Sequence, residues 1–128
     1  MKKIAHYEFE APKIIGILSD RTVPSTIQRK FDQVLKRKKL PFVCLPFRVE
    51  TKHLKNVTAC MRLMDIEGII ILGGHERRIK KFVASMDPLS KEAGKVNLLK
   101  KKRNKFNGYY IEKTRNFYQT AVKLLTSR

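Results

Sequence analysis

His75 and Glu76 are the residues whose type and position first indicate chemistry in this sequence. They follow an apolar run, 68–72, that ends in Gly73-Gly74. This pattern predicts a buried strand, a glycine turn and the start of a helix. In open α/β sheets, ligands bind outside the carboxyl ends of such strands. The backbone amides from Gly74 to Glu76, at a helix N-terminus, would suit a small carboxylate or phosphate.

Three apolar runs and the segments between them form the frame that must position this corner. The runs at 13–18, 42–49 and 68–72 predict strands, and Pro46 makes the second an edge or bulged strand because proline lacks an amide donor. Apolar residues spaced as on one helix face predict a helix after each strand. They are Ile27, Phe31, Val34 and Leu35, then Leu54, Val57, Met61 and Met64, then Ile79, Phe82 and Val83. The order βαβαβα predicts an α/β domain of three layers with a mainly parallel sheet.

The last third of the sequence changes character. Asp87-Pro88 predicts a turn, and 95–99 and 106–111 predict a C-terminal β-hairpin whose tip, 100–105, is rich in lysine. A final helix has one apolar face, formed by Phe117, Ala121, Leu124 and Leu125. No repeat or linker interrupts the sequence, so we expect a single domain over residues 1–128.

The composition excludes several classes of protein. A hydrophobic content of 42% with 31% charged residues is that of a folded, water-soluble domain. No apolar run is long enough to span a membrane, and the first residues lack the apolar core of a signal peptide. Cys44 and Cys60 have no zinc-ligand spacing, which predicts reduced, mostly buried thiols, no metal site and a cytoplasmic location. The net charge of +18 favours non-specific attraction to polyanions, or serves solubility alone.

Six short strings stand in an order and spacing known from one enzyme family. They are 13–18, 45–49, 68–71 followed by His75, 86–93, 94–97 and 108–112, and together they span roughly residues 13–117. The sequence there resembles the N-terminal, substrate-binding domain of shikimate dehydrogenases. Members of that family continue into a Rossmann domain that binds NADP through a glycine-rich turn. No Gly-x-Gly-x-x-Gly occurs here, so we expect no NADP-binding domain and no cofactor.

The resemblance assigns family roles to individual positions, most of which carry a different residue here. The replaced positions are Ile70 (asparagine), Leu72 (threonine), Glu76 (the catalytic lysine), Arg21 and Val23 (paired serines), Tyr110 and Ile111 (asparagine and threonine), and Glu112 (the catalytic aspartate). The retained positions are Pro24, His75 and Asn97. The resemblance therefore implies a substrate-binding architecture without its catalytic lysine.

Glu76 and Glu112 change the chemistry that their positions support. A lysine beside an aspartate can pass a proton to the reacting oxygen, which two carboxylates cannot copy. If the two glutamates meet, they can share one proton and serve acid–base hydrolysis. The alternative is that both are solvated at a cleft that no longer catalyses a reaction.

Arg21 adds an anion-binding group to the same corner. An arginine can hold a carboxylate or phosphate through two parallel hydrogen bonds. Together with Gly74, His75 and Asn97, it predicts a site for a small anionic or polyhydroxylated ligand. Each of these residues also has a structural interpretation, since Arg21 can form a salt bridge with Asp20 or Glu76, His75 can cap a helix or lie at the edge of the core, and Asn97 can hold a turn.

Two other surfaces are candidates for contact with macromolecules. The basic hairpin tip, with Tyr109 and Tyr110 nearby, has the composition of a surface that contacts phosphates and stacks on bases. Lysines at such tips also protect edge strands from aggregation. The apolar face along Phe117, Leu124 and Leu125 would be exposed without a partner domain, which predicts a homodimer.

These observations together predict a substrate-binding domain that stands alone and is inactive as a dehydrogenase. We expect it to bind a small anionic or polyhydroxylated metabolite. Two alternatives stay open at this point. One is a basic interaction module that binds nucleic acid or an acidic protein, and the other is an enzyme that uses Glu76 and Glu112.

Overall fold

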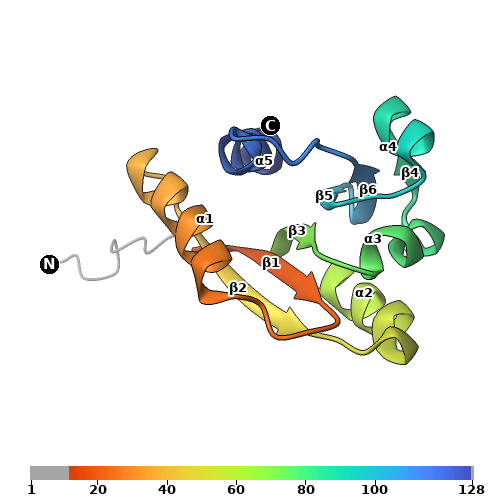
Figure 1. Cartoon of the computed structure of the whole chain (residues 1–128). Helices are drawn as coiled ribbons and strands as arrows, with labels where there is room; N and C mark the ends of the chain where they lie inside the picture. The colour runs from red at the N-terminus through yellow and green to blue at the C-terminus, as the bar shows by residue number, and fades with distance from the viewer. Residues whose placement is uncertain (1–11, 128) are drawn as a thin grey trace, which may run out of the picture.

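Six strands form one sheet through the described structure (Figure 1). The computed structural model describes residues 12–127. The strands are β1 (Lys13–Ser19), β2 (Phe42–Arg48), β3 (Ile66–Ile71), β4 (Ser85–Met86), β5 (Leu98–Lys102) and β6 (Lys105–Tyr109), in the order β2-β1-β3-β5-β6-β4. β1 is parallel to β2 and β3, whereas β5 is antiparallel to β3 and β6, and β4 is parallel to β6. The predicted parallel sheet and C-terminal hairpin are both confirmed.

Helices cover both faces of this sheet. They are α1 (Ser25–Arg37), η2 (Thr51–His53), α2 (Leu54–Arg62), α3 (His75–Arg78), η3 (Ile79–Phe82), α4 (Pro88–Ala93) and α5 (Phe117–Thr126), where η marks a 3-10 helix. α1 buries Phe31, Val34 and Leu35, as its apolar spacing predicts. Its last turn carries Lys36 and Arg37, whose charges are favourable beside the negative end of the helix dipole.

The two faces of the sheet have separate cores, because side chains alternate along a strand. Ile15 and Ile17 of β1 belong to the core that includes α1 and α5. Leu18 belongs to the core on the other face, together with Leu54 of α2 and Ile79 of η3. The domain is therefore an α/β structure of three layers, as the sequence predicts.

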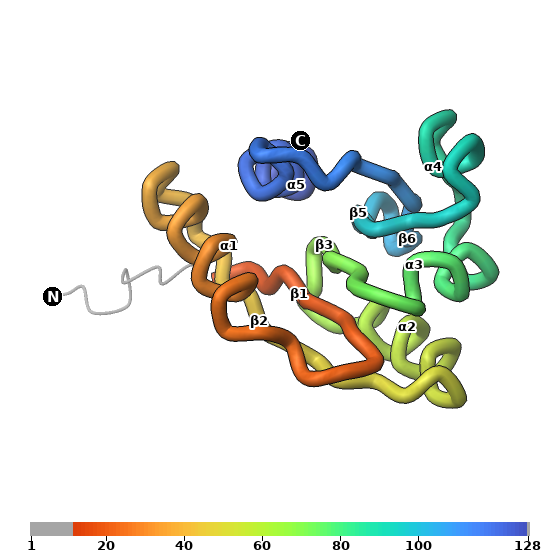
Figure 2. Tube along the Cα trace, in the orientation of Figure 1, coloured from red at the N-terminus to blue at the C-terminus, as the bar shows by residue number. Residues whose placement is uncertain are grey.

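α5 closes the face of the sheet that α1 covers, so the last element of the chain returns beside the first helix (Figure 2). The ring of Phe31 lies 6.2 Å from that of Phe117 and 4.7 Å from that of Tyr118. Leu125 packs over Gly68, where a Cβ atom would come within 2.7 Å of Leu125 Cδ2. Phe117 and Leu125 are buried and Leu124 is half-buried. The face of α5 on which the sequence predicts a homodimer is thus packed largely within the domain.

Some elements differ from the sequence-based expectations. Asp87 begins a helix rather than a simple turn, because its Oδ1 accepts a hydrogen bond of 2.9 Å from the Ser90 amide. The first hairpin strand starts at Leu98 rather than at Lys95. Met64, predicted on the apolar face of the second helix, lies beyond the end of α2 and is 52% exposed.

The strand order creates a topological switch point between β1 and β3. The chain leaves β1 through α1 to reach β2 on one side, and it returns through α2 to β3 on the other side. β1 leads into α1 and β3 leads into α3 and η3. Because α1 and η3 pack on opposite faces of the sheet, the loops at the carboxyl ends of β1 and β3 diverge. A crevice is expected at such a point, and ligands bind there in open α/β sheets.

Candidate functional site

A cleft of about 780 Å³ opens at this switch point. Its walls come from the ends of two adjacent strands and from the segment that leads into α5. The residues that line it are Ser19, Asp20, Arg21, Thr22, Pro24, Ile27, Leu72, Gly73, Gly74, Lys113, Thr114, Phe117 and Tyr118. The lining combines apolar side chains with charged and hydroxyl side chains that offer hydrogen bonds.

The glycine turn after β3 brings backbone close to Asp20. Gly73 has a φ of +65°, a left-handed conformation that glycine adopts without steric cost. A Cβ atom on Gly73 would lie 3.3 Å from Asp20 Oδ1, and one on Gly74 would lie 2.8 Å from Arg78 Nη1. On the other strand, the Arg21 amide donates a 3.1 Å hydrogen bond to Ser19 Oγ. A side chain at Gly73 or Gly74 would therefore crowd Asp20 or Arg78, and a local hydrogen bond holds the turn after β1.

Glu76 forms an ion pair with Lys113, whose side chain lines the cleft. Lys113 Nζ lies 2.6 Å from Glu76 Oε2. The Glu76 side chain is only 6% exposed, whereas that of Lys113 is 53% exposed. A buried carboxylate thus holds an ammonium group at a wall that solvent can reach.

Arg21 is exposed and contributes a second cation to the same cleft. The two ion pairs found within residues 12–127 are Lys52–Glu50 and Lys113–Glu76, so Arg21 forms neither of the alternative salt bridges, with Asp20 or with Glu76. The guanidinium is available to bind an anion in two parallel hydrogen bonds. Asp20, the acidic residue in the lining, can accept hydrogen bonds from ligand hydroxyl groups.

His75 lies behind the cleft rather than in its lining. Its ring is fully buried, and Nε2 lies 2.6 Å from the carbonyl oxygen of Val49, to which it donates. Nδ1 is buried and has no hydrogen-bond partner among the described residues. His75 therefore ties the start of α3 to the segment after β2, and its side chain does not cap the helix.

Asn97 is also buried, and its side chain bonds to the backbone. Nδ2 donates to the Ile111 carbonyl oxygen at 2.7 Å, and Oδ1 accepts from the Ile111 amide at 2.9 Å. This pair of hydrogen bonds fixes the segment after β6, which leads directly to Lys113. Asn97 thus positions a residue of the cleft without lining it.

Glu76 pairs with Lys113, so the condition for a carboxylate pair between Glu76 and Glu112 is not met. Glu112 is exposed, and in the part of the chain that the structure describes it neither lines the cleft nor forms an ion pair. The sequence-based interpretation missed Lys113, Asp20, Thr22 and Thr114. Lys113 stands one residue beyond the position given to the family's aspartate, and that adjacency was the signal for it.

Metal ligands, the two cysteines and membrane-spanning helices are the remaining features that the described structure bears on. Residues 12–127 contain no group of three or more potential metal ligands. Burial, followed by the charge of Asp32, raises the pKa of the Cys44 thiol to about 12. Cys60 is exposed rather than buried, and both cysteines are free. Within the same residues, no helix is long and apolar enough to cross a membrane.

The chain is similar in sequence to known enzymes. No family model matches the chain. It is 30% identical over 97 residues to a shikimate dehydrogenase (NADP(+)) of Methanococcus aeolicus, covering 76% of this chain and 35% of that protein. It is 28% identical over 96 residues to that of Dehalococcoides mccartyi, covering 75% of this chain and 32% of that protein. The chain spans about a third of the length of these curated relatives.

The fold is also similar to that of a shikimate dehydrogenase of known structure. The crystal structure of shikimate dehydrogenase 1 from Peptoclostridium difficile matches with a TM-score of 0.73 and 18% identity, covering 77% of this chain and 36% of that chain. Sequence and structure therefore both match shikimate dehydrogenases over about three quarters of this chain.

Proposed function

We propose that this chain is a substrate-binding domain of the shikimate dehydrogenase type, whose cleft binds a small, polyhydroxylated carboxylate. One observation carries the proposal: Arg21 and Lys113 line one cleft at the switch point of the sheet. Both side chains can donate hydrogen bonds to a carboxylate, since the Lys113 ammonium group has hydrogens beyond the one that it donates to Glu76.

The size and lining of the cleft suit a small molecule. Its volume of about 780 Å³ lies within the range of small-molecule sites in proteins. Ile27, Leu72 and Phe117 offer apolar contact for a carbon ring, and the hydroxyl groups of Thr22 and Thr114 offer hydrogen bonds. A ligand with one carboxylate and several hydroxyl groups matches this combination.

The ion pair with Lys113 supports the absence of dehydrogenase activity. Glu76 occupies the position that the resemblance assigns to the catalytic lysine, and its carboxylate is held by an ammonium group at 2.6 Å. The pair has the opposite polarity to the family's lysine and aspartate. In this proposal the cleft retains binding, and the chain does not carry out hydride transfer.

A thermal-shift panel tests the proposal. The panel contains shikimate, quinate, inorganic phosphate and the methyl ester of shikimate, which has the same hydroxyl groups but no charge. Ligand at about 100 times its dissociation constant stabilises a protein by about 2.7 kcal/mol, so binding raises the melting temperature by several degrees.

Two variants locate the site. Arg21→Gln and Lys113→Gln should each weaken binding of the carboxylate at least about tenfold, since a charged hydrogen bond contributes roughly 1.5–3 kcal/mol. Arg115→Gln is the matched control, because Arg115 is exposed and lies outside the cleft lining. Equal binding of the acid and its ester, or no response to any compound, would contradict the proposal.

A further inference from the structure

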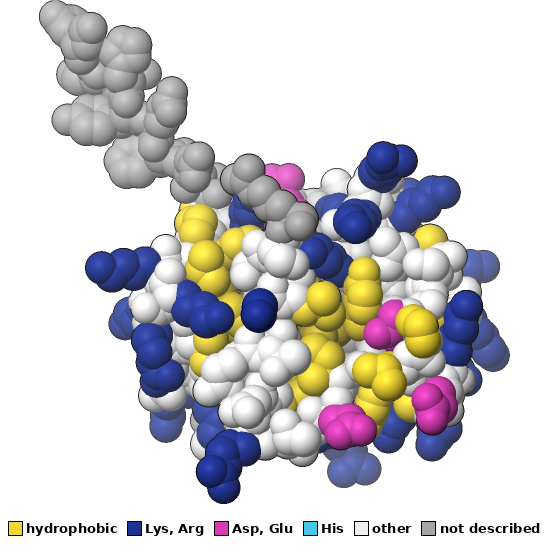
Figure 3. All heavy atoms as spheres, turned by 90° about the horizontal axis from the view of Figure 1, so that it is seen from above, with side chains coloured by type: hydrophobic (Ala, Val, Ile, Leu, Met, Phe, Trp, Pro, Cys, Tyr) yellow, Lys and Arg dark blue, Asp and Glu magenta, His cyan; other side chains and the backbone are white. Residues whose placement is uncertain are grey.

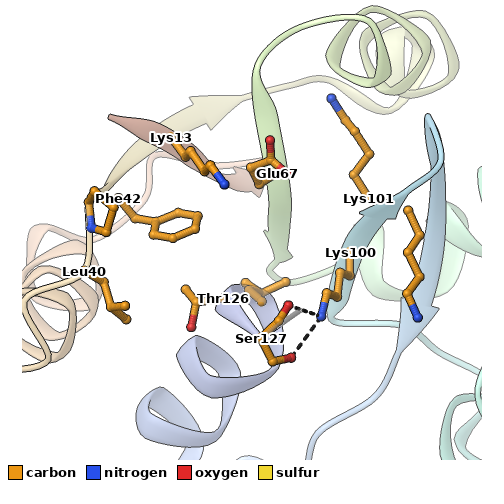
Figure 4. Close-up of a pocket in the computed structure, with 11 residues that line it drawn as sticks. Lys13, Leu40, Phe42, Glu67, Lys100, Lys101, Thr126 and Ser127 are labelled. Carbon is orange, nitrogen blue, oxygen red and sulfur yellow. Dashed lines mark hydrogen bonds between the residues drawn. The ribbon is translucent and has the colours of Figure 1, made fainter. Parts of the chain in front are cut away.

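A second cavity, of about 710 Å³, lies at the opposite edge of the sheet, where β1 and β2 begin (Figure 4). It shares no lining residue with the cleft. Its walls come from the starts of these strands, from β5 and from the end of α5. It is therefore a separate feature of the molecule.

Lysines dominate the lining of this cavity. Lys13, Lys100, Lys101 and Lys102 surround it, and Glu67 is the acidic residue among the lining residues. The ion pairs within residues 12–127 include none of these four lysines. The cavity therefore has a positive charge that the described part of the protein does not neutralise.

Two of these ammonium groups are held in place by neutral oxygen atoms. Lys100 Nζ donates to the Ser127 carbonyl oxygen at 2.6 Å and to Ser127 Oγ at 2.9 Å, as Figure 4 shows. Lys101 Nζ donates to the Met64 carbonyl oxygen. An ammonium group has three hydrogens, so each retains at least one for a further acceptor. Burial, followed by the nearby charge of Lys102, lowers the pKa of Lys100, and the negative charge of a bound anion would favour its protonated form.

An aromatic ring lies beside these cations. The ring of Phe42 projects toward the cavity in Figure 4, and Lys13 Nζ lies 5.9 Å from its centroid. Leu40, Pro41 and Leu125 add apolar surface to the same lining. A flat, apolar group can therefore pack within reach of the ammonium groups.

Basic residues continue along the edge beyond the cavity. Lys38 and Lys39 precede Leu40 at the end of α1, and Arg103 and Lys105 lie at the turn between β5 and β6. All four are exposed. In Figure 3, which views the molecule from above, Lys and Arg side chains lie around most of its outline. The positive surface is longer than one small anion.

We propose that this edge binds single-stranded nucleic acid, with phosphates on Lys13 and on the lysines at 100–102, and a base against Phe42. A strand of nucleic acid carries one charge per nucleotide and a flat ring beside each charge, which matches a row of cations beside an aromatic group. An acidic peptide would match the charges but would leave the ring unused. Lysines contact phosphates as point charges, so we expect little sequence preference.

Fluorescence anisotropy with labelled 20-mers of uridine and of thymidine tests this proposal on the full chain. Each phosphate contact with a single strand contributes roughly −0.7 to the slope of log K against log salt, so four lysines predict a slope of about −3. An abasic 20-mer has the same phosphates but no bases, and it should bind at least about fivefold more weakly. The two labelled strands report whether RNA or DNA is preferred.

Two sets of lysine variants distinguish binding at this site from attraction by the net charge of the protein. Replacing the three lysines at 100–102 with glutamine should weaken binding at least about tenfold and reduce the slope to about −1. The control replaces the exposed Lys55, Lys81 and Lys91, which removes the same charge from α2, η3 and α4. It should bind like the unmodified chain.

Arginine at 100–102 should restore binding, and a melting curve for each variant confirms that it folds. An equal loss in the control would show that net charge alone binds the strand and would overturn the proposal. Equal affinity for the abasic strand, equal binding of polyglutamate of the same charge, or no binding at 50 mM salt would also overturn it.

Discussion

Glu76 and Lys113 should contribute unequally to stability, although they form one ion pair. The Glu76 side chain is 6% exposed and that of Lys113 is 53% exposed. Removing Lys113 leaves a carboxylate with little access to water, whereas removing Glu76 leaves an ammonium group that water can solvate. Replacing Lys113, the exposed partner, should therefore lower the free energy of unfolding more than replacing Glu76.

The magnitude follows from the position of the pair between two limits. Breaking a fully buried pair costs about 3–5 kcal/mol, and exposed pairs contribute about 0.2–1 kcal/mol. Water reaches Lys113, so we expect Lys113→Met to lower the free energy of unfolding by about 2 kcal/mol and Glu76→Gln by about 0.5–1 kcal/mol. The double variant should cost less than the sum, with a coupling energy of about 1 kcal/mol.

Urea unfolding followed by circular dichroism measures all three variants. Arg115→Met is the control for removing a cation from the same segment, since Arg115 is exposed, and it should change stability by less than about 0.5 kcal/mol. Equal costs for the two single variants, or strict additivity in the double variant, would refute the reasoning from burial.

Three further predictions concern the two thiols, the packing of Gly68 in the core and the ionisation of Asp32. In the native protein at pH 8, Ellman's reagent should modify the exposed Cys60 and spare the buried Cys44, whose pKa is raised to about 12. Unfolding in urea should make both thiols reactive, and rapid reaction of both in the native state would contradict this prediction. Gly68→Ala should cost about 1–3 kcal/mol, because its Cβ would meet Leu125 Cδ2 at 2.7 Å, and shortening Leu125 in the same chain should recover part of that loss in thermal unfolding. Burial raises the pKa of Asp32 in the folded state, so folding favours the protonated acid. The protonated acid therefore contributes to stability at low pH, and this contribution is lost as pH rises through the folded pKa. Asp32→Asn should therefore gain stability relative to the unmodified chain between pH 3 and pH 6, and a relative loss over that range would be contrary to the assignment.

The fold could be predicted because its signals are local. Apolar runs and helix-face spacing define β1, β3 and α1 within windows of a few residues. The glycine turn at Gly73-Gly74 also marks the cleft, because a ligand edge in an α/β sheet follows from strand order. The two-residue strand β4 has no such local signal, since it depends on pairing with β6.

The details of the site depend on contacts between distant residues and were not predicted. Lys113 reaches Glu76 across 37 positions of sequence, and the periodicity of neither segment reports it. His75 and Asn97 have side chains that suit a ligand, but their burial is decided by Val49 and Ile111, which contact them only in the folded chain. Polar residue types indicated where the site lies, and tertiary packing decided which of them line it.

Binding in the cleft at the carboxyl ends of β1 and β3 is the central claim, and an amide chemical-shift titration tests it most directly. Shikimate is added to the ¹⁵N-labelled chain while the amide of every described residue is followed. The account predicts saturable shifts at Arg21, Gly73, Gly74 and Thr114, with none at Lys13 or Lys101 on the opposite edge. Shifts confined to the opposite edge, or no saturable shift at the cleft, would contradict it.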